Sequence, residues 1–268
     1  MVKHETYNFS VNDVSAVYAG PGGKLWELLM GEHIHVGGVE QTDVLARKVG
    51  LDNRKNLSIL DICSALGGPA RHLAEHYDAN VVGLDITPEM IAEAKKRTEG
   101  KSYEKKIEYR LGSALDIPAH DASFDIIWGQ DAWCYIRDKK RLIEECWRVL
   151  KPGGTLAFTD WIWGTKSVPK AESDYLMTFM VFPNMETFDG YTTLIETKGF
   201  RLTETVYLGK VFAVHVDQYV KKLQASKKAI VDGFGANAYT DAEKGLLAWQ
   251  KAAHEDKVGL GLWIARKP

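Results

Sequence analysis

The stretch that decides the fold is residues 57–77, LSILDICSALGGPARHLAEHY. A short apolar run ends at Asp61, a loop of small residues follows, and residues 69–77 have the pattern of a helix. This order is typical of a nucleotide-type cofactor site beyond the carboxyl end of a parallel strand. Such loops usually carry glycine, yet Cys63 and Ala65 stand at two of these places. The loop alone is therefore weak evidence of a cofactor.

The segments that follow repeat the same order. Residues 80–85 (NVVGLD) predict a second strand that stops at an acid, and residues 87–98 predict a helix with Thr87 as N-cap and Pro88 at its first position. An amphipathic helix is expected over 139–150. Three more apolar runs predict strands: 106–114, 124–131 and 154–161. Apolar strands separated by helices imply a parallel sheet covered on both faces.

After residue 161 the pattern changes. Residues 175–191 (YLMTFMVFPNMETFDGY) are rich in Met and Phe and predict a cap over a site. Residues 201–209 and 258–267 predict two more strands. Two helices are expected between these strands, at about 215–231 and 240–255.

Composition favours a small-molecule ligand. The chain has 268 residues, 45% hydrophobic and 26% charged, which is ordinary for a globular protein. A net charge of -2 gives no broad electrostatic reason to expect nucleic acid or an anionic membrane as a partner. No window approaches the roughly 18 apolar residues that a membrane span requires. We expect neither a nucleic-acid nor a membrane partner.

Three cysteines, Cys63, Cys134 and Cys146, lie apart without CxxC spacing. This pattern argues against a disulfide framework or a zinc site, so we expect no metal and a cytoplasmic location. Cys63 precedes a helix N-terminus, which can lower the pKa of a thiol, so a reactive thiolate is the alternative to a small buried residue.

Asp85 closes the second predicted strand. An acid at this place can accept hydrogen bonds from both ribose hydroxyls, and its charge would oppose a 2′-phosphate. The sequence therefore predicts an adenosine-type cofactor.

Four segments in order resemble the class I S-adenosylmethionine (SAM)-dependent methyltransferases. They cover residues 57–160 and read LDICSALGG, VVGLDITPEMIAEAKKR, GSALDIPAHDASFDIIWGQDAW and EECWRVLKPGGTLAFTD. Within this superfamily the chain looks most like the small-molecule branch of sarcosine/dimethylglycine and phosphoethanolamine N-methyltransferases. The segments that resemble this branch are YAGPGGKLWELLMGEHIHVGG, WGQDAW and GLLAWQKAAHEDKVGLGLWIARK.

The resemblance implies a Rossmann-like α/β fold with a seven-stranded, mostly parallel sheet whose last strand is antiparallel. Residues 1–268 are expected to form a single methyltransferase domain. Its parts would be an N-terminal helical lid, a SAM-binding core, a cap after the fifth strand, and a C-terminal part of sheet and helices: 1–45, 55–161, 162–195 and 196–268.

The resemblance also assigns roles within the site. Asp61 and the loop that follows it would cradle the methionine end of SAM, and the end of the second strand would contact ribose and adenine. The tyrosine of the lid would close over SAM and substrate. The expected cofactor residues are Tyr18, Asp61, Ser64, Ala65, Gly67, Gly68, Asp85, Ile86, Ser113, Ala114, Leu115 and Gln130. Gln130 and Asp131 would lie nearest the methyl group, and the product would be S-adenosylhomocysteine (SAH).

Two departures from this branch bear on the substrate. Tyr135 stands where the relatives place a histidine, so deprotonation assisted by histidine is not implied. The cap segment 175–191 lacks Arg and Lys, which a bound phosphate would require for charge-assisted hydrogen bonds. Phosphoethanolamine is therefore disfavoured as the acceptor.

An amine acceptor must be deprotonated when it attacks. Asp131 could orient it, while Tyr18 or Tyr135 contacts it through a hydroxyl, and these three are the expected catalytic residues. Aromatic faces such as Trp133, Tyr135 and Phe182 could hold a methylated ammonium through cation–π attraction of about 0.5–2 kcal/mol each.

Further substrate contacts are expected from the lid and the cap. His33 and His35 are interpreted as lid residues near the substrate, with surface positions and a metal pair as alternatives. Met180 and Phe182 belong to a Met and Phe set that either packs the cap onto the sheet or lines a partly apolar substrate pocket. Trp26 is expected in the core.

The functional hypothesis is SAM-dependent methylation of a small molecule, at the nitrogen of a glycine-derived or similar amine. One alternative is C- or O-methylation of a larger apolar acceptor of the quinone or polyketide type. Others are a SAM-binding protein without transferase activity and a nicotinamide-dependent oxidoreductase.

Overall fold

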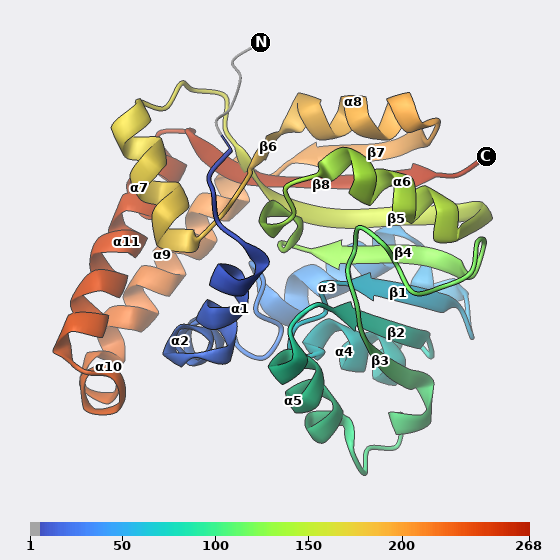
Figure 1. Cartoon of the computed structure of the whole chain (residues 1–268), viewed down its shortest axis with the longest axis horizontal. Coiled ribbons are helices and arrows are strands. Elements are labelled where there is room, and N and C mark those ends of the chain that lie inside the picture. The colour runs from blue at the N-terminus through green and yellow to red at the C-terminus, as the bar shows by residue number, and fades with distance from the viewer. Residues whose placement is uncertain (1–5) are drawn as a thin grey trace.

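The computed structural model describes residues 6–268, which contain one mixed sheet (Figure 1). Its main path runs β3-β2-β1-β4-β5-β8-β7, and β6 pairs only with β5. The strands are β1 Ser58–Ile62, β2 Asn80–Asp85, β3 Ile107–Leu111, β4 Phe124–Gln130, β5 Leu150–Trp163, β6 Glu186–Thr187, β7 Arg201–Tyr207 and β8 Val258–Arg266.

The direction of the strands confirms the predicted α/β class. β1 to β5 pair with one another in parallel, whereas β8 runs antiparallel to both β5 and β7. The structure has one strand more than the seven expected. This strand is β6, which has two residues and pairs with the end of β5. A strand of two residues has no periodicity that a sequence pattern could reveal.

Helices cover both faces of this sheet (Figure 1). One face packs against α3 (Gly38–Lys48), α4 (Gly68–His76) and α5 (Pro88–Thr98), with residues such as Leu45 and Leu73 in the core. The other face packs against α6 (Lys139–Val149) and α8 (Phe188–Lys198). The two-sided cover explains why the strands read as continuous apolar runs.

A third core lies beside the end of β5 (Figure 1). It is formed mainly by α2 (Pro21–Met30), α7 (Lys170–Met180), α9 (Gly209–Ala225), α10 (Lys227–Phe234) and α11 (Ala236–His254). The two helices expected between β7 and β8 are in fact three, because the chain breaks at Ser226 and again at Gly235, where φ is +91°. The lid helix α1 (Val11–Ala19) lies next to α2 and α5.

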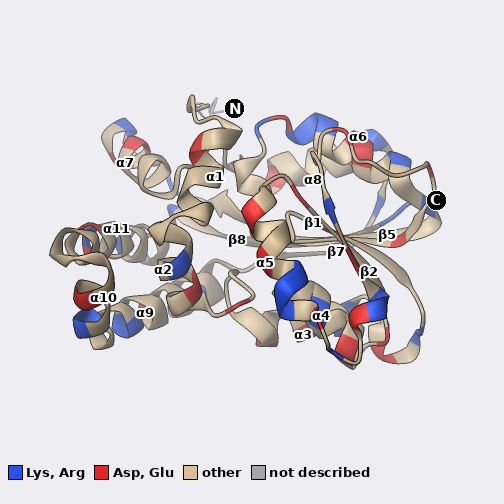
Figure 2. Ribbon diagram, turned by 60° about the horizontal axis from the view of Figure 1, so that its bottom comes forward, with Lys and Arg blue, Asp and Glu red and all other residues tan. Residues whose placement is uncertain are grey.

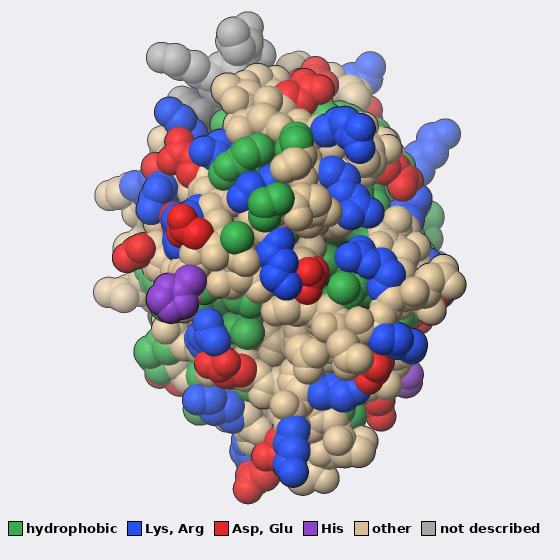
Figure 3. All heavy atoms as spheres, turned by 90° about the vertical axis from the view of Figure 1, so that its right-hand side faces the viewer, with side chains coloured by type: hydrophobic (Ala, Val, Ile, Leu, Met, Phe, Trp, Pro, Cys, Tyr) green, Lys and Arg blue, Asp and Glu red, His purple; other side chains and the backbone are tan. Residues whose placement is uncertain are grey.

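Charges of both signs occur on the outer helices on each side of the sheet (Figure 2). On the face seen in Figure 3, Lys and Arg are intermingled with Asp and Glu. Within residues 6–268 no helix has both the length and the apolar character needed to traverse a bilayer.

Candidate active site

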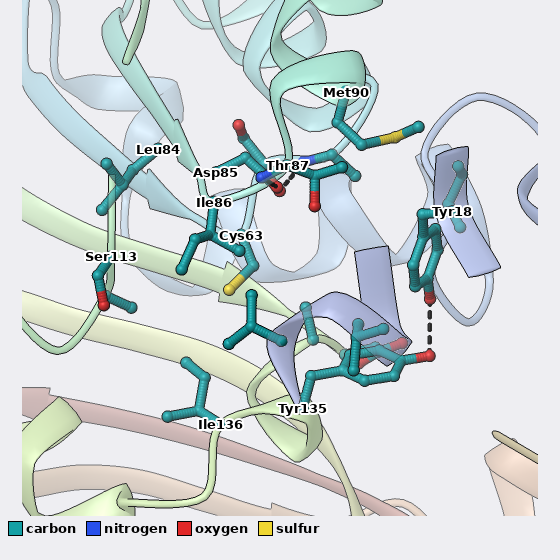
Figure 4. Close-up of a pocket in the computed structure, with 18 of the residues that line it drawn as sticks. Tyr18, Cys63, Leu84, Asp85, Ile86, Thr87, Met90, Ser113, Tyr135 and Ile136 are labelled. Atoms are coloured by element: carbon teal, nitrogen blue, oxygen red, sulfur yellow. Dashed lines mark hydrogen bonds between the residues drawn. The ribbon is translucent and has the colours of Figure 1, made fainter. Parts of the chain in front are cut away.

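A cavity of about 420 Å³ lies at the carboxyl ends of β1, β2 and β4 (Figure 4). The strand ends contribute Asp61, Asp85 and Gln130, while Tyr18 of α1 and the preceding segment 8–11 line the lid side. Cavities of this volume accommodate cofactor-sized ligands. The position is the one that a parallel α/β sheet favours for a ligand.

The loop after β1 has the backbone of a glycine loop without glycine at two of its positions. The φ angles are +63° at Cys63 and +44° at Ala65, in the left-handed region that L-residues adopt rarely. The Ala65 N–H donates to Asp85 Oδ2 at 2.9 Å, and the Ser64 N–H donates to the carbonyl of Leu84 at 3.0 Å. Two hydrogen bonds to the end of β2 therefore hold this conformation.

Gly67 and Gly68 do not line the cavity. A Cβ at Gly67, where φ is +71°, would lie 2.2 Å from the hydroxyl oxygen of Tyr109. At Gly68 it would lie 2.6 Å from the carbonyl oxygen of Glu32. These glycines therefore have a packing role instead of the expected contact with the cofactor, because their small size allows α4 to start against β3 and the lid.

Three buried polar atoms that border the cavity have no hydrogen-bond partner in the described residues: Asp61 Oδ2, Ser64 Oγ and Gln130 Nε2. Burial, with a smaller contribution from Asp85, raises the pKa of Asp61 to about 8. Buried polar atoms are rarely left unpaired in proteins, so such atoms beside a cavity indicate a polar ligand. An acidic acceptor beside two donors suits a group that carries both an ammonium and a carboxylate.

Gln130 is fixed with its amide nitrogen free. Its Oε1 accepts hydrogen bonds from Trp128 Nε1 at 3.0 Å and from the Thr42 hydroxyl at 3.1 Å. Because both donors hold the oxygen, Nε2 is left for a ligand.

Asp85 lies at the centre of the wall shown in Figure 4. Its Oδ1 accepts a hydrogen bond from the Thr87 N–H and its Oδ2 accepts one from the Ala65 N–H, with N···O distances of 2.9 Å in both. Burial raises the pKa of this carboxyl. Each carboxylate oxygen keeps a further lone pair for a ligand hydroxyl. The residues expected around adenine also line the cavity: Ile86, Ser113, Ala114 and Leu115.

Asp131 follows β4 in a left-handed conformation, with φ of +59°. Its Oδ2 accepts the Val36 N–H from the lid segment at 2.7 Å, and its Oδ1 accepts the Thr159 hydroxyl at 2.5 Å. Burial raises the pKa of Asp131 to about 7. The carboxyl is thus fixed between lid and sheet and titrates near neutral pH.

The hydroxyls of Tyr18 and Tyr135 are hydrogen-bonded at 2.7 Å across the cavity (Figure 4). Their rings meet edge to face, with centroids 5.6 Å apart. Burial raises the pKa of both phenols well above the ordinary value. Both tyrosines therefore stay protonated, and neither can serve as a phenolate base.

Two expected substrate residues lie away from the cavity. The His35 ring is buried, with Nε2 2.9 Å from the Thr42 hydroxyl, and burial lowers its pKa to about 3. His33 lines the cavity instead. Trp133 is fully buried in the sheet core, stacked on Phe158 with centroids 4.1 Å apart. The expected substrate contacts of His35 and Trp133 are thus corrected to structural positions.

Met180 and Phe182 line a second, smaller pocket of about 10 Å³ instead of the main cavity. Its other walls include Trp26, which the sequence places in the core, and Trp161 at the end of β5. The two spaces share four lining residues: Tyr18, Ile34, Asp131 and Tyr135. The tyrosine pair and Asp131 therefore lie between them.

The segment that covers the cavity lies within the predicted lid (1–45), but sequence reasoning singled out none of its lining residues. Asn8, Phe9, Ser10 and Val11 line it, and Arg137 Nη2 donates to the carbonyls of Tyr7 and Phe9 at 2.8 and 3.2 Å. The extended segment before α1 has no apolar periodicity. The signal that could have located it is the capping box of Ser10 and Asp13 at the start of α1.

Cys63 also lines the cavity, but burial, Asp85 and Asp61 raise the pKa of its thiol well above the ordinary value. The thiolate alternative is therefore disfavoured. Within residues 6–268 no group of His, Cys, Asp and Glu is arranged to hold a metal ion.

The sheet order, the reversed β8 and the cavity at the strand ends define the class I, Rossmann-like methyltransferase fold. Residues 60–158 match the family model described as the methyltransferase domain.

Named relatives agree with this assignment. The chain is 27% identical to a glycine/sarcosine/dimethylglycine N-methyltransferase of Actinopolyspora halophila, over 88% of this chain and 43% of that protein. It is 30% identical to the 2-methyl-6-phytyl-1,4-hydroquinone methyltransferase of a Synechocystis strain, over 50% of this chain and 46% of that protein. The chain spans about half the length of the curated relatives it matches.

A solved structure has the same fold. The phosphoethanolamine N-methyltransferase 2 of Haemonchus contortus, in complex with phosphomonomethylethanolamine and S-adenosylhomocysteine, gives a TM-score of 0.87. The similarity covers 97% of this chain and 61% of that one, at 22% sequence identity.

Proposed function

We propose that this protein is a SAM-dependent methyltransferase that acts on the nitrogen of a small amine of the sarcosine/dimethylglycine type or similar. The observation that carries the proposal is the set of unpaired polar atoms beside the main cavity, Asp61 Oδ2, Ser64 Oγ and Gln130 Nε2. The match to the methyltransferase domain over 60–158 and the N-methyltransferase relatives support it. We treat residues 1–268 as one such domain.

The residues present fit SAM. Asp61 would bind the ammonium of its methionine part, and Ser64 Oγ and Gln130 Nε2 would donate to the carboxylate. Asp85 would accept hydrogen bonds from the ribose hydroxyls. Ile86, Ser113, Ala114 and Leu115 would surround the adenine. When bound, SAM supplies an electrophilic methyl group: the amine lone pair forms the new N–C bond while the C–S bond breaks and its electron pair stays on sulfur, which leaves SAH.

The residues between the two pockets would control the proton of the amine. An amine arrives as an ammonium and must lose a proton before it attacks. The tyrosine hydroxyls stay protonated, so they can orient the nitrogen but cannot take its proton. Asp131 titrates near neutral pH and can accept that proton on a carboxylate oxygen. Segment 8–11 and α1 would keep bulk water from the reacting atoms.

Methylation at carbon or oxygen of a larger apolar acceptor is the second candidate. The hydroquinone methyltransferase relative and the apolar lining by Met180 and Phe182 favour it. A SAM-binding protein without transferase activity is the third.

Calorimetric titration of the purified protein with SAH, followed by a panel of amines and phenols scored by SAH release, tests the proposal. We expect micromolar SAH binding and release with amines. Release only with phenols would favour the second candidate, binding without release on any acceptor would favour the third, and binding of NADH in place of SAH would overturn the proposal.

The proposal includes a small-molecule acceptor as partner and a cytoplasmic location. The free cysteines Cys63, Cys134 and Cys146 support a reducing compartment. Cell fractionation with an antibody to the chain would test this location.

A further inference from the structure

We infer that the second pocket is the acceptor subsite and that it takes an alkylamine whose other substituents are hydrocarbon, without a carboxylate or a phosphate. This inference rests on the proposed methyltransferase activity and narrows its acceptor to amines that lack the carboxylate of sarcosine and dimethylglycine. It concerns the space bounded by the lid, the end of β5 and the cap.

The walls of the pocket are mainly aromatic, formed by Tyr18, Trp26, Tyr135, Trp161 and Phe182. Phe182 meets two of the other rings edge to face: its centroid is 4.9 Å from that of Tyr135 and 5.5 Å from that of Trp161. Aromatic faces attract cations, including a quaternary ammonium, which has no N–H to donate. The same negative faces repel an anion.

Asp131 is the one charged residue among the described residues that line this pocket, and none of them is Lys, Arg or His. Both of its oxygens already accept hydrogen bonds, from Val36 and Thr159. The carboxylate therefore needs no N–H of the ligand, and it can balance a tertiary or quaternary nitrogen through space. A carboxylate or phosphate in this pocket would be buried unpaired beside a like charge, which is costly.

One arginine lines the main cavity in the described residues, and it is already engaged. Arg137 donates to the carbonyls of Tyr7 and Phe9, which tie it to the segment over the cavity. Of the histidines, His33 lines the cavity, but burial lowers its pKa to about 4, so it is neutral near pH 7. Neither side chain lines the second pocket, so neither offers a cation to an anionic acceptor there.

The pocket has room for about one water in this state, so an acceptor must displace side chains. Met30 and Met180 are the adaptable walls, because unbranched thioethers change shape at little cost. Ile34, which borders both spaces, has φ of +48°, and Val181, which precedes Phe182, has φ of +56°. Branched residues held in this region mark places where surrounding structure maintains strain, as it does at ligand clamps.

The test compares three product-like cations on the full chain saturated with SAH, by isothermal titration. Propyltrimethylammonium carries only hydrocarbon, glycine betaine adds a carboxylate to the same trimethylammonium group, and phosphocholine adds a phosphate. We expect propyltrimethylammonium to bind at least about tenfold more tightly than either of the others. Equal or tighter binding of betaine or phosphocholine, or no binding of any of the three, would overturn the inference. Absence of SAH binding would instead overturn the proposed function.

Two variants locate the subsite. Phe182→Leu should weaken propyltrimethylammonium binding about three- to tenfold without changing SAH affinity. Phe200→Leu is the matched control, since Phe200 is also buried but packs on Trp147; it should change neither affinity. Met180→Lys should shift the preference toward betaine and phosphocholine. Equal effects of the two Phe variants would contradict the location.

Discussion

The two spaces at the carboxyl edge of the sheet differ in kind. The main cavity, of about 420 Å³, keeps unpaired polar atoms on rigid strand ends, whereas the second pocket, of about 10 Å³, is filled by the flexible and aromatic side chains of its own walls. The polar cradle of the main cavity is formed by Asp61, Ser64, Asp85 and Gln130. A preformed polar site of this kind suits a ligand that many relatives share, and an adaptable apolar pocket suits one that varies between them. Under the proposed function, the main cavity would bind the methyl donor and the second pocket would select the acceptor.

The largest effect is expected from a change at the start of α4, behind the polar cradle. Gly67→Val adds a Cβ that would lie 2.2 Å from the Tyr109 hydroxyl, at a φ of +71° that a branched residue rarely adopts. Strain of about 1–3 kcal/mol adds to a clash of similar size, so SAH affinity should fall roughly 100-fold or more by calorimetry. Gly153→Val is the control for strain alone, because Gly153 has φ of +74° and open space around it. Equal losses in both variants would contradict a role for close packing.

The protonation of Asp61 predicts that SAH affinity depends on pH. Burial raises the pKa of Asp61 to about 8, so below that pH the apo protein holds a proton there. An ammonium requires the carboxylate, so binding releases the proton, and SAH affinity should rise with pH by up to about tenfold per unit between pH 6 and 8, then level off.

Asp61→Asn should remove most of this slope and lower SAH affinity at pH 8 by roughly 10- to 100-fold, the value of a hydrogen bond to a charged group. Calorimetry at pH 6, 7, 8 and 9 measures both effects. An unchanged slope in the variant would assign the titration to another group, such as Asp131, whose pKa burial raises to about 7.

The cradle was predictable from the sequence, and the second pocket only in part: Met180 and Phe182 were expected beside the substrate, but not their aromatic neighbours. Asp61 and Asp85 end apolar runs of strand length, and the ends of parallel strands meet at one edge, so their convergence follows from the pattern. Trp26, Trp161 and Phe182 come from α2, β5 and the segment after α7, and only tertiary packing brings them together.

The same dependence on the folded structure explains why two predicted substrate residues, Trp133 and His35, lie away from the cavity. Trp133 lies only two residues from Asp131, yet the 3-10 turn at Trp133–Tyr135 directs it into the core and leaves Tyr135 at the cavity. His35 and His33 alternate in the same way, with one ring at the cavity and the other behind it. The direction of a side chain in an irregular segment depends on its φ and ψ values, which no periodicity encodes.

A smaller effect is expected at the boundary between the two spaces. Tyr135→Phe removes the partner of the Tyr18 hydroxyl, which is 2.7 Å away, and leaves both rings in place. Loss of one such hydrogen bond is worth about 1–1.5 kcal/mol, so kcat should fall roughly 5- to 13-fold while SAH affinity stays constant. Tyr135→His can still bond to Tyr18 and should lose less. Steady-state kinetics with calorimetry tests this, and a parallel loss of SAH affinity would place the pair in the cradle instead.

The smallest effect is expected where the cradle departs from glycine. Cys63 and Ala65 have φ of +63° and +44°, so glycine would relieve strain at both positions. The gain is offset by the greater freedom that glycine gives the unfolded chain, about 0.5–1 kcal/mol. Cys63→Gly and Ala65→Gly should therefore change the free energy of unfolding by no more than about 1 kcal/mol, measured by denaturant titration, and SAH affinity by no more than about threefold. Cys63→Val cannot adopt this conformation without strain and should lose far more. The Ala65 N–H that binds Asp85 belongs to the backbone, so the glycine variants keep it. A tenfold loss in either variant would mean that the side chains of Cys63 and Ala65, and not only the backbone shape of the loop, are needed for SAH binding.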